Sequence, residues 1–186
     1  LRQLAEKDSL TGLYNRHYFT AELERVMQRS LRQHGIDCAL LYIDLDNFKF
    51  VNDTLGHLAG DRVLIEVAGL LTKRTRKSDM IARLGGDEFA VLLYDVDVEQ
   101  ALATAENYRQ LLADYNFRHE GRVVDIGCSI GLAMFGADIT SREELMARAD
   151  IACHMAKRAG RNSVHLYEAS DRANMDTMFA DMGWAR

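Results

Sequence analysis

The stretch Cys38-Ala-Leu-Leu-Tyr-Ile-Asp-Leu45 decides the fold, because it is an almost unbroken apolar run of strand length. A run of this kind predicts a strand that is buried on both faces of a sheet. It ends at two acids, Asp44 and Asp46, whose side chains point to the same face if the strand alternation continues. Adjacent carboxylates repel each other and are stable chiefly when a hard divalent cation neutralises them. From these residues alone, both a cation site and a pair of solvated acids that cap the next helix remain open.

Outward from this strand, the spacing of apolar residues predicts alternating helices and strands. Helical spacing covers 16–33, 59–75, about 101–112 and about 141–158, and a glycine at position 160 stops the last helix. Strand-like runs cover 79–84, 88–94, about 123–134 and 163–167. The chain contains no proline, and no repeat or flexible linker interrupts this pattern. We therefore predict one α/β domain in which helices flank a mixed central β-sheet.

The length and the charge of the chain fit a single soluble domain with a small ligand. A chain of 186 residues can bury one well-packed core but not a second full domain. The formal net charge of −5 lacks the basic footprint that a nucleic-acid polymer requires, whereas a small nucleotide needs only a few placed cations. No apolar stretch is long enough to cross a bilayer, so we expect no membrane contact by this domain itself.

The three cysteines, Cys38, Cys128 and Cys153, lie far apart, and each falls within an apolar run. The sequence contains no CxxC pair, so nothing in it suggests a zinc site or a redox motif. We expect buried, reduced thiols and hence a cytoplasmic location.

A second pair of acids lies in Arg83-Leu84-Gly85-Gly86-Asp87-Glu88-Phe89, at the junction of two strand-like runs. Consecutive glycines permit positive φ, so this junction predicts a tight hairpin with Asp87 and Glu88 at its tip. Turns of this sort also occur for structural reasons alone, but two acids at the start of an apolar strand are unusual. We expect the tip to fold back against the end of the 38–45 strand, next to Asp44.

The run Gly85-Gly-Asp-Glu-Phe89 is the signature of the GGDEF family of diguanylate cyclases, and further blocks resemble that family in the same order and spacing. These blocks are Asp8-Ser-Leu-Thr-Gly-Leu-Tyr-Asn-Arg16, 44–61, Ser129-Ile-Gly131 and 149–162. The resemblance covers about residues 8–167. It implies a fold like the palm of nucleotidyl cyclases and polymerases. It also implies phosphoryl transfer, in which two GTP molecules are joined into cyclic di-GMP and two pyrophosphates.

The resemblance assigns roles to the acids. It implies that Mg²⁺, with Mn²⁺ as an alternative ion, binds Asp44, the backbone carbonyl of Leu45, and Asp87. Either Asp87 or Glu88 would help to deprotonate the ribose 3′-hydroxyl that attacks the α-phosphate of the partner GTP. The sequence does not choose between them.

Further positions match residues with which the family binds its substrate. The implied nucleotide contacts are Asn47, Phe48, Lys49, Asn52, His57, Asp61, Gly85, Gly86, Lys157 and Arg161. Asn52 and Asp61 would read guanine, because a carboxylate can accept hydrogen bonds from N1–H and the exocyclic amine. Outside this register, Lys157 and Arg161 would only complement the dipole at a helix end.

Arg76 and Asp79 match the pair with which the family grips cyclic di-GMP in product inhibition, although an exposed pair at this spacing also arises by chance. By resemblance, residues 1–7 are the end of an upstream signalling helix and 8–167 are the catalytic domain. Residues 168–186 would then be a linker helix or tail, similar to one that leads into an EAL phosphodiesterase domain.

Three functions are compatible with these residues. The first is an active cyclase that works as a homodimer, because one site holds one GTP and ring closure needs two. The expected partners are then GTP, cyclic di-GMP, a second copy of the chain, and attached sensor and EAL domains. The second is a silent module that binds GTP or cyclic di-GMP and regulates an attached phosphodiesterase, which the intact set of acids and cations argues against. The third, an adenylyl cyclase or polymerase-like palm, would lack the glycine hairpin.

Overall fold

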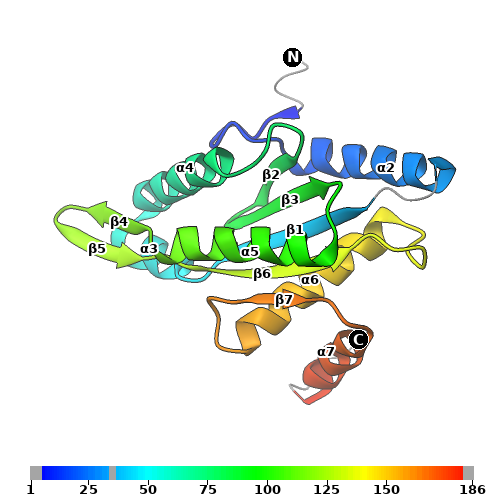
Figure 1. Ribbon diagram of the computed structural model, residues 1–186. Helices are drawn as coiled ribbons and strands as arrows, with labels where there is room; N and C mark the ends of the chain where they lie inside the picture. Colours follow the sequence, from blue (N-terminus) through cyan, green and yellow to red (C-terminus); the bar gives the residue numbers. More distant parts are fainter. Residues whose placement is uncertain (1–5, 34–36, 182–186) are drawn as a thin grey trace.

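Strand β1 (Cys38–Leu45) runs through the middle of the sheet, as its apolar sequence predicts. In the computed structural model, which describes residues 6–33 and 37–181, the strand order is β2-β3-β1-β6-β7. The other strands of this sheet are β2 (Met80–Gly85), β3 (Glu88–Tyr94), β6 (Cys128–Met134) and β7 (Val164–Leu166). Neighbouring strands are antiparallel except β6 and β7, which are parallel. The predicted mixed α/β fold is thus confirmed (Figure 1).

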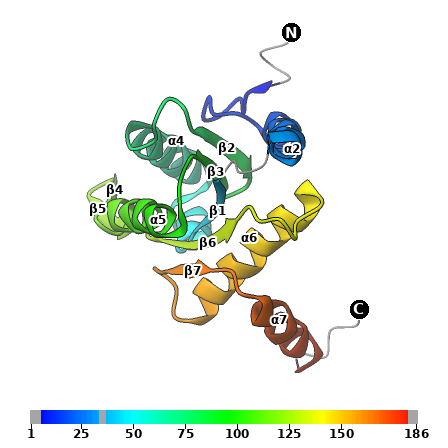
Figure 2. The ribbon, with the colours of Figure 1, turned by 45° about the vertical axis from the view of Figure 1, so that its right-hand side comes forward.

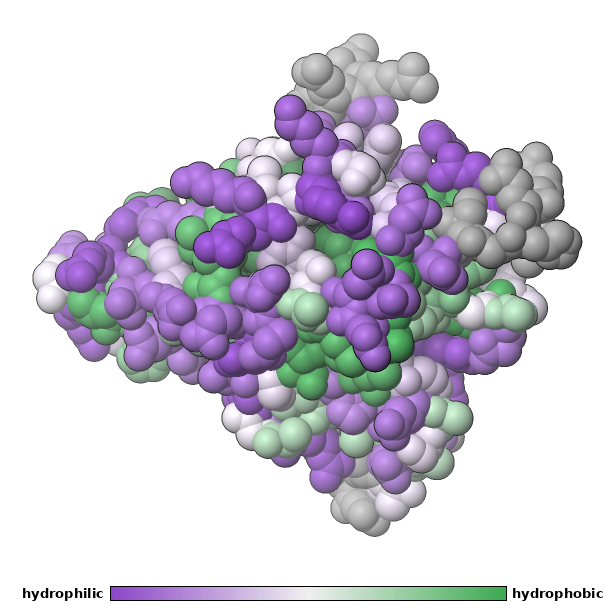
Figure 3. All heavy atoms as spheres, in the orientation of Figure 1, coloured by the Kyte–Doolittle hydropathy of each residue, from purple (hydrophilic) through white to green (hydrophobic). Residues whose placement is uncertain are grey.

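Helices cover both faces of this sheet (Figure 2). They are α2 (Arg16–Gln33), α3 (Phe48–Leu55), α4 (His57–Lys73), α5 (Val98–Ala113), α6 (Arg142–Arg158) and α7 (Ala169–Asp181). Leu41 and Ile43 of β1 belong to the core under α4 and α5, whereas Leu40 and Tyr42 belong to the core under α2 and α6. The outward side chains of α4 and α5 are mainly hydrophilic, as Figure 3 shows. The alternation of β1 therefore decides that Asp44, two residues after Tyr42, faces α6.

The predicted strand over about 123–134 is wrong, because two separate elements occupy this range. Strand β5 (Arg122–Asp125) pairs with β4 (Asn116–His119) in a hairpin outside the main sheet, and β6 begins only at Cys128. Between them Gly127 has a φ of +67°, which turns the chain and which glycine adopts without strain. The carbonyl of Gly127 accepts a hydrogen bond from the N–H of Asp46 at 3.2 Å, so this turn borders the end of β1.

The segment after β7 forms α7, which packs on α6. The Arg172 guanidinium donates to both carboxylate oxygens of Glu144, at 2.9 and 2.7 Å. Residues 1–5 and 182–186 lie outside the described residues, so the expected upstream helix and the end of the expected linker fall largely there. In the parts of the chain that the structure describes, no helix has both the length and the apolar character to cross a membrane.

The three cysteines are buried and free, as predicted. Burial raises the pKa of Cys38 to about 11 and also raises the pKa of Cys128 and of Cys153. These thiols stay protonated at neutral pH and serve as small core side chains.

Candidate active site

Strand β1 and the β2–β3 hairpin bring two acids together. In the β1–β3 ladder Asp44 is the register partner of Glu88, and the N–H of Leu45 donates to the carbonyl of Asp87 at 3.3 Å. The tip of the hairpin therefore lies beside the end of β1. Burial, then the charge of Asp44 and a hydrogen bond with its carboxyl group, raise the pKa of Asp87 to about 7. A cation or a proton must offset the repulsion between these two groups.

Two glycines and the N-terminal segment shape this hairpin. Gly85 and Gly86 have φ values of +145° and +48°, in the region that favours glycine. The Arg83 guanidinium donates to the carbonyl of Gly86 and pairs with Asp8, each at 3.0 Å. Asp8 also accepts hydrogen bonds from the N–H and the hydroxyl of Thr11, at 2.9 and 2.7 Å. Residues 8–11 thus brace the acidic hairpin.

Lys157, near the end of α6, donates a hydrogen bond to the Asp44 carboxylate. Burial opposes the charge of this ammonium group, but the hydrogen bond and the attraction of Asp44 outweigh it and raise the pKa of Lys157. Helix α6 can approach the sheet because β6 has a glycine there. A Cβ added at Gly131 would lie 2.1 Å from the carbonyl oxygen of Ala149. The Lys157 ammonium group, held at the end of β1, is suited to donate a hydrogen bond to a phosphate oxygen.

Asp46 faces a different set of partners. Its side chain is 7% exposed and lies past the end of β1. It accepts hydrogen bonds from the Ser129 hydroxyl at 2.7 Å and from the N–H of Asn162 at 2.9 Å, with Arg161 4.0 Å away. Strand alternation predicts Asp46 on the same face as Asp44; Asp46 lies one residue past the end of β1 and has partners of its own, while the hairpin tip contacts Asp44. Asp46 instead holds the turn after α6, where Arg161 and Asn162 have φ values of +66° and +46°.

The phosphate-binding candidates at the start of α3 are directed elsewhere. The Asn47 amide donates to the carbonyl of Asp125 at 2.7 Å, and Phe48 packs against the core. The Lys49 ammonium pairs with Asp53 at 2.8 Å on the surface of α3, and its side chain is 89% exposed. The structure therefore places Lys157 at the acids and leaves Lys49 on an exposed helix face.

The guanine-reading candidates come from the packing of α3 on α4. A Cβ added at Gly60 would lie 1.8 Å from Oδ1 of Asn52, so the Asn52 amide lies directly against α4. Asp61 is the next residue of that helix and is exposed, and His57 is exposed at the first position of the same helix. Gly60 is not among the site residues that the sequence motifs predict. A signal was present in the sequence, because Gly60 lies inside a stretch with helical spacing. A glycine there lowers the stability of the helix, so its presence indicates that another group approaches closely.

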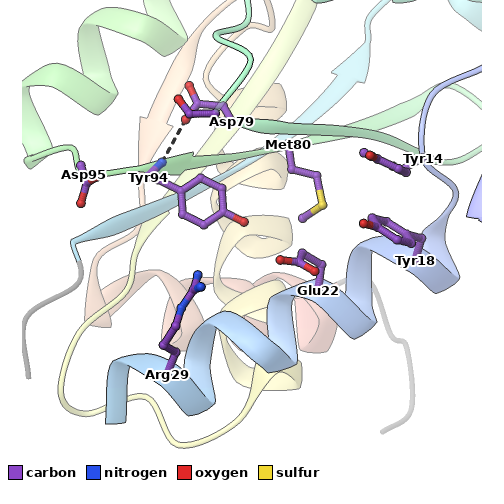
Figure 4. Close-up of a pocket in the computed structure, with 9 residues that line it drawn as sticks. Tyr14, Tyr18, Glu22, Arg29, Asp79, Met80, Tyr94 and Asp95 are labelled. Atoms are coloured by element: carbon purple, nitrogen blue, oxygen red, sulfur yellow. Dashed lines mark hydrogen bonds between the residues drawn. The ribbon is translucent and has the colours of Figure 1, made fainter. Parts of the chain in front are cut away.

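Arg76 and Asp79 lie at the opposite end of the sheet. The Arg76 guanidinium donates to both oxygens of the Asp79 carboxylate, at 2.8 and 3.1 Å, and the N–H of Tyr94 donates to it at 3.1 Å. Tyr94 is the register partner of Cys38, the first residue of β1. A cavity of about 420 Å³ opens beside this pair, next to α2 (Figure 4). Its lining includes Tyr18, Glu22, Arg29, Asp79, Met80 and Tyr94.

The donor atoms at the end of β1 suit a hard cation. Carboxylate and carbonyl oxygens are the ligands that Mg²⁺ prefers. The Asp44 and Asp87 carboxyl groups are in contact, and Leu45, whose carbonyl is the expected third ligand, follows Asp44 directly. Among residues 6–33 and 37–181, no group of three or more His, Cys, Asp or Glu side chains could hold a metal ion. Two carboxylates, one backbone oxygen and substrate phosphates are nevertheless a usual environment for Mg²⁺.

A mixed sheet that gathers acids at the end of its central strand and on the facing hairpin defines a nucleotidyl cyclase palm fold. The model of the diguanylate cyclase GGDEF domain family matches residues 5–163. The chain belongs to this family.

Relatives and solved structures agree with this assignment. The chain is 44% identical over 176 residues to the probable diguanylate cyclase DgcE of Escherichia coli, which covers 93% of the chain but 16% of DgcE. The GGDEF domain of TpbB from Pseudomonas aeruginosa matches with a TM-score of 0.85 and 38% identity, over 91% of the chain and 99% of that domain. The GGDEF domain of DgcB from Caulobacter crescentus, solved in complex with cyclic di-GMP, matches with a TM-score of 0.82 and 32% identity. This match covers 87% of the chain and 95% of the DgcB domain. The chain thus corresponds to one part of the longer DgcE.

Proposed function

We propose that this domain condenses two molecules of GTP into cyclic di-GMP and two pyrophosphates. The observation that carries the proposal is the contact of Asp44 with Asp87, and with Lys157, where β1 meets the glycine hairpin. The family of the chain and the name of DgcE support the same activity.

Asp44, Asp87 and the carbonyl of Leu45 would hold Mg²⁺, with Mn²⁺ as an alternative ion. Bound there, the ion would offset the charge of the triphosphate and of the α-phosphate during transfer. Lys157 and Arg161 would donate to phosphate oxygens. Lys157 would exchange its present acceptor, the Asp44 carboxylate, for a phosphate once a cation neutralises that acid.

The base would bind between α3 and α4, with Asn52 and Asp61 on its edge and His57 at the border. The Asp61 carboxylate can accept from N1–H and the exocyclic amine of guanine, and adenine offers no such donor pair. Gly85 and Gly86 would let the nucleotide cross the hairpin, since nothing lies within 4 Å of the positions their Cβ atoms would take. Asn47, Phe48 and Lys49 would close the phosphate end, where a rotation of Lys49 away from Asp53 would free its ammonium group.

The reaction requires a second copy of the domain. One site holds one GTP, so the 3′-hydroxyl of each GTP must attack the α-phosphate bound by a facing copy. Asp87 or Glu88 would take the proton of that hydroxyl. A homodimer is therefore the proposed active form, with attached sensor or EAL domains in a longer cytoplasmic protein.

Product inhibition is a further part of the proposal. Arg76 and Asp79 would open their mutual ion pair and grip cyclic di-GMP, the ligand with which the DgcB domain was solved. A module that binds GTP or cyclic di-GMP without turnover is not favoured, because it would not need the acids and the cation at the end of β1.

Chromatography of the purified domain after incubation with GTP and Mg²⁺ tests the proposal directly. We expect cyclic di-GMP and pyrophosphate, and we expect chelation of the metal to stop their formation. Asp87→Ala should abolish turnover while the unfolding temperature stays close to that of the wild type. Asp138→Ala is the matched control, because this exposed acid pairs with Arg148 at 2.9 Å in another part of the domain. A confirmed dimer that binds GTP and leaves it unconverted would instead favour the silent module.

A further inference from the structure

Glu88 has a hydrogen-bond partner of its own, beside the contact between Asp44 and Asp87. The Tyr42 hydroxyl donates a hydrogen bond to Oε2 of Glu88 at 2.8 Å. Tyr42 lies on β1 two residues before Asp44, on the same face, and the residue is 6% exposed. A buried phenol on a central strand has a nearly fixed position, so it fixes the carboxylate that it binds.

This contact needs an explanation, because the ladder favours another arrangement. Asp44 and Glu88 are direct register partners, and such pairs have Cβ atoms about 5 Å apart on one face of the sheet. Without a separate partner, the Glu88 carboxylate would crowd the two acids already in contact there. The hydrogen bond from Tyr42 gives the Glu88 carboxylate that separate partner.

The neighbours of Tyr42 leave room for this role. Its register partners are Ala90 on β3 and Gly131 on β6, which are both small. The phenol ring can therefore lean along the sheet and reach Glu88, which is its diagonal neighbour, at a separation that aromatic side chains can bridge. A leucine at this position would fill the core equally well but would offer no donor.

We propose that Tyr42 is a positioning residue that holds the Glu88 carboxylate apart from the Asp44 and Asp87 pair. The two paired acids then serve the cation, and Glu88 stays available to accept the proton of the ribose 3′-hydroxyl. As that oxygen bonds to the α-phosphorus of the partner GTP, the proton passes to Glu88 and pyrophosphate leaves with the electrons of the broken P–O bond. This inference rests on the proposed cyclase activity.

Steady-state kinetics of Tyr42→Phe tests it, because this change removes one hydroxyl and keeps the ring in the core. We expect kcat to fall about 10- to 100-fold, the range typical of a misplaced reacting group. The KM for GTP should stay within about a factor of two, since Tyr42 touches neither the base nor the phosphates in this scheme. Tyr115→Phe is the matched control. It removes an equivalent hydrogen bond, from a partly buried phenol to Glu66 at 2.6 Å, outside the site, and should leave both constants unchanged.

A double-variant cycle separates a role through Glu88 from a general loss of structure. In a Glu88→Gln background, Tyr42→Phe should cost less than about a factor of two in kcat, because no base is left to position. Three outcomes would each overturn the inference and leave the cyclase activity standing. They are an equal loss of kcat in both backgrounds, a wild-type kcat in Tyr42→Phe, and a change in the KM for GTP without a change in kcat. A wild-type dimer that makes no cyclic di-GMP would overturn the proposed function, and this inference with it.

Discussion

Replacing Gly131 with alanine should destabilise the domain severely, because the new methyl group has no space. Its Cβ would lie 2.1 Å from the carbonyl oxygen of Ala149 and 2.2 Å from the backbone nitrogen of Cys153. Both atoms belong to the backbone of α6, so no rotation of a side chain can relieve the clash. Helix α6 must move away from β6, and it carries Lys157 with it.

The size of the effect follows from the cost of overpacking. Inserting a methyl group into a filled core costs about 1–3 kcal/mol, and a rigid obstacle places this case at about 3 kcal/mol. In a domain of this size, each kcal/mol lowers the unfolding temperature by about 2–4 °C, so we expect a fall of about 6–12 °C. Displacement of α6 should also reduce turnover, because Lys157 then loses Asp44.

Thermal unfolding followed by circular dichroism measures this effect, with Gly69→Ala as the matched control. Gly69 lies inside α4, and nothing lies within 4 Å of an added Cβ. Alanine there should stabilise the domain by about 0.5–1 kcal/mol, because it restricts the unfolded chain and favours the helix. The same added methyl group should thus act in opposite directions at the two sites. A Gly131→Ala protein that unfolds at the wild-type temperature would refute the proposed close contact between α6 and the sheet.

Three further variants test other parts of the site. Gly60→Ala should raise the KM for GTP about tenfold, because its Cβ would displace the Asn52 amide that we assign to guanine; an unchanged KM would argue against that assignment. Arg109 donates to the Asn162 amide oxygen at 2.9 Å and so supports the turn after α6. Arg109→Ala should weaken GTP binding about threefold to tenfold by calorimetry, and equal affinity would exclude such support. Arg76→Ala should leave the initial rate unchanged and remove the slowing of the reaction as product accumulates, whereas inhibition at wild-type product concentrations would contradict a role in feedback.

Strand β1 and the acidic hairpin could be predicted from the sequence because local residues specify both. Eight consecutive residues of β1 are buried, which is what an unbroken apolar run indicates. The hairpin needs two positive φ angles, and Gly85 and Gly86 supply them where two strand-like runs meet. The family blocks added the order and spacing that neither feature has alone.

The hairpin of β4 and β5 could not be predicted from such rules. Val123 and Val124 look like the start of a strand that continues into β6, and apolar periodicity does not reveal that Gly127 turns the chain between them. The single strand over about 123–134 was therefore a reasonable prediction that tertiary structure overrides. The same limit applies to the acids. Alternation places Asp44 and Asp46 on one face, but it does not reveal that β1 ends before Asp46 and that Ser129 binds it.

The two candidate sites lie at opposite ends of the same strands, which constrains how product could inhibit the enzyme. Asp79 accepts a hydrogen bond from the backbone N–H of Tyr94, which is the register partner of Cys38. Asp44, the register partner of Glu88, lies six residues further along β1 than Cys38. At about 3.3 Å per residue, the separation along the sheet is about 20 Å, which is too far for product at Asp79 to overlap a nucleotide at Asp44. Inhibition through this pair must therefore lower kcat without competing with GTP. It can do so by changing how two copies face each other, because each copy supplies only half of the reaction. Competitive inhibition by cyclic di-GMP that persists in Arg76→Ala would mean that product binds at the active site instead.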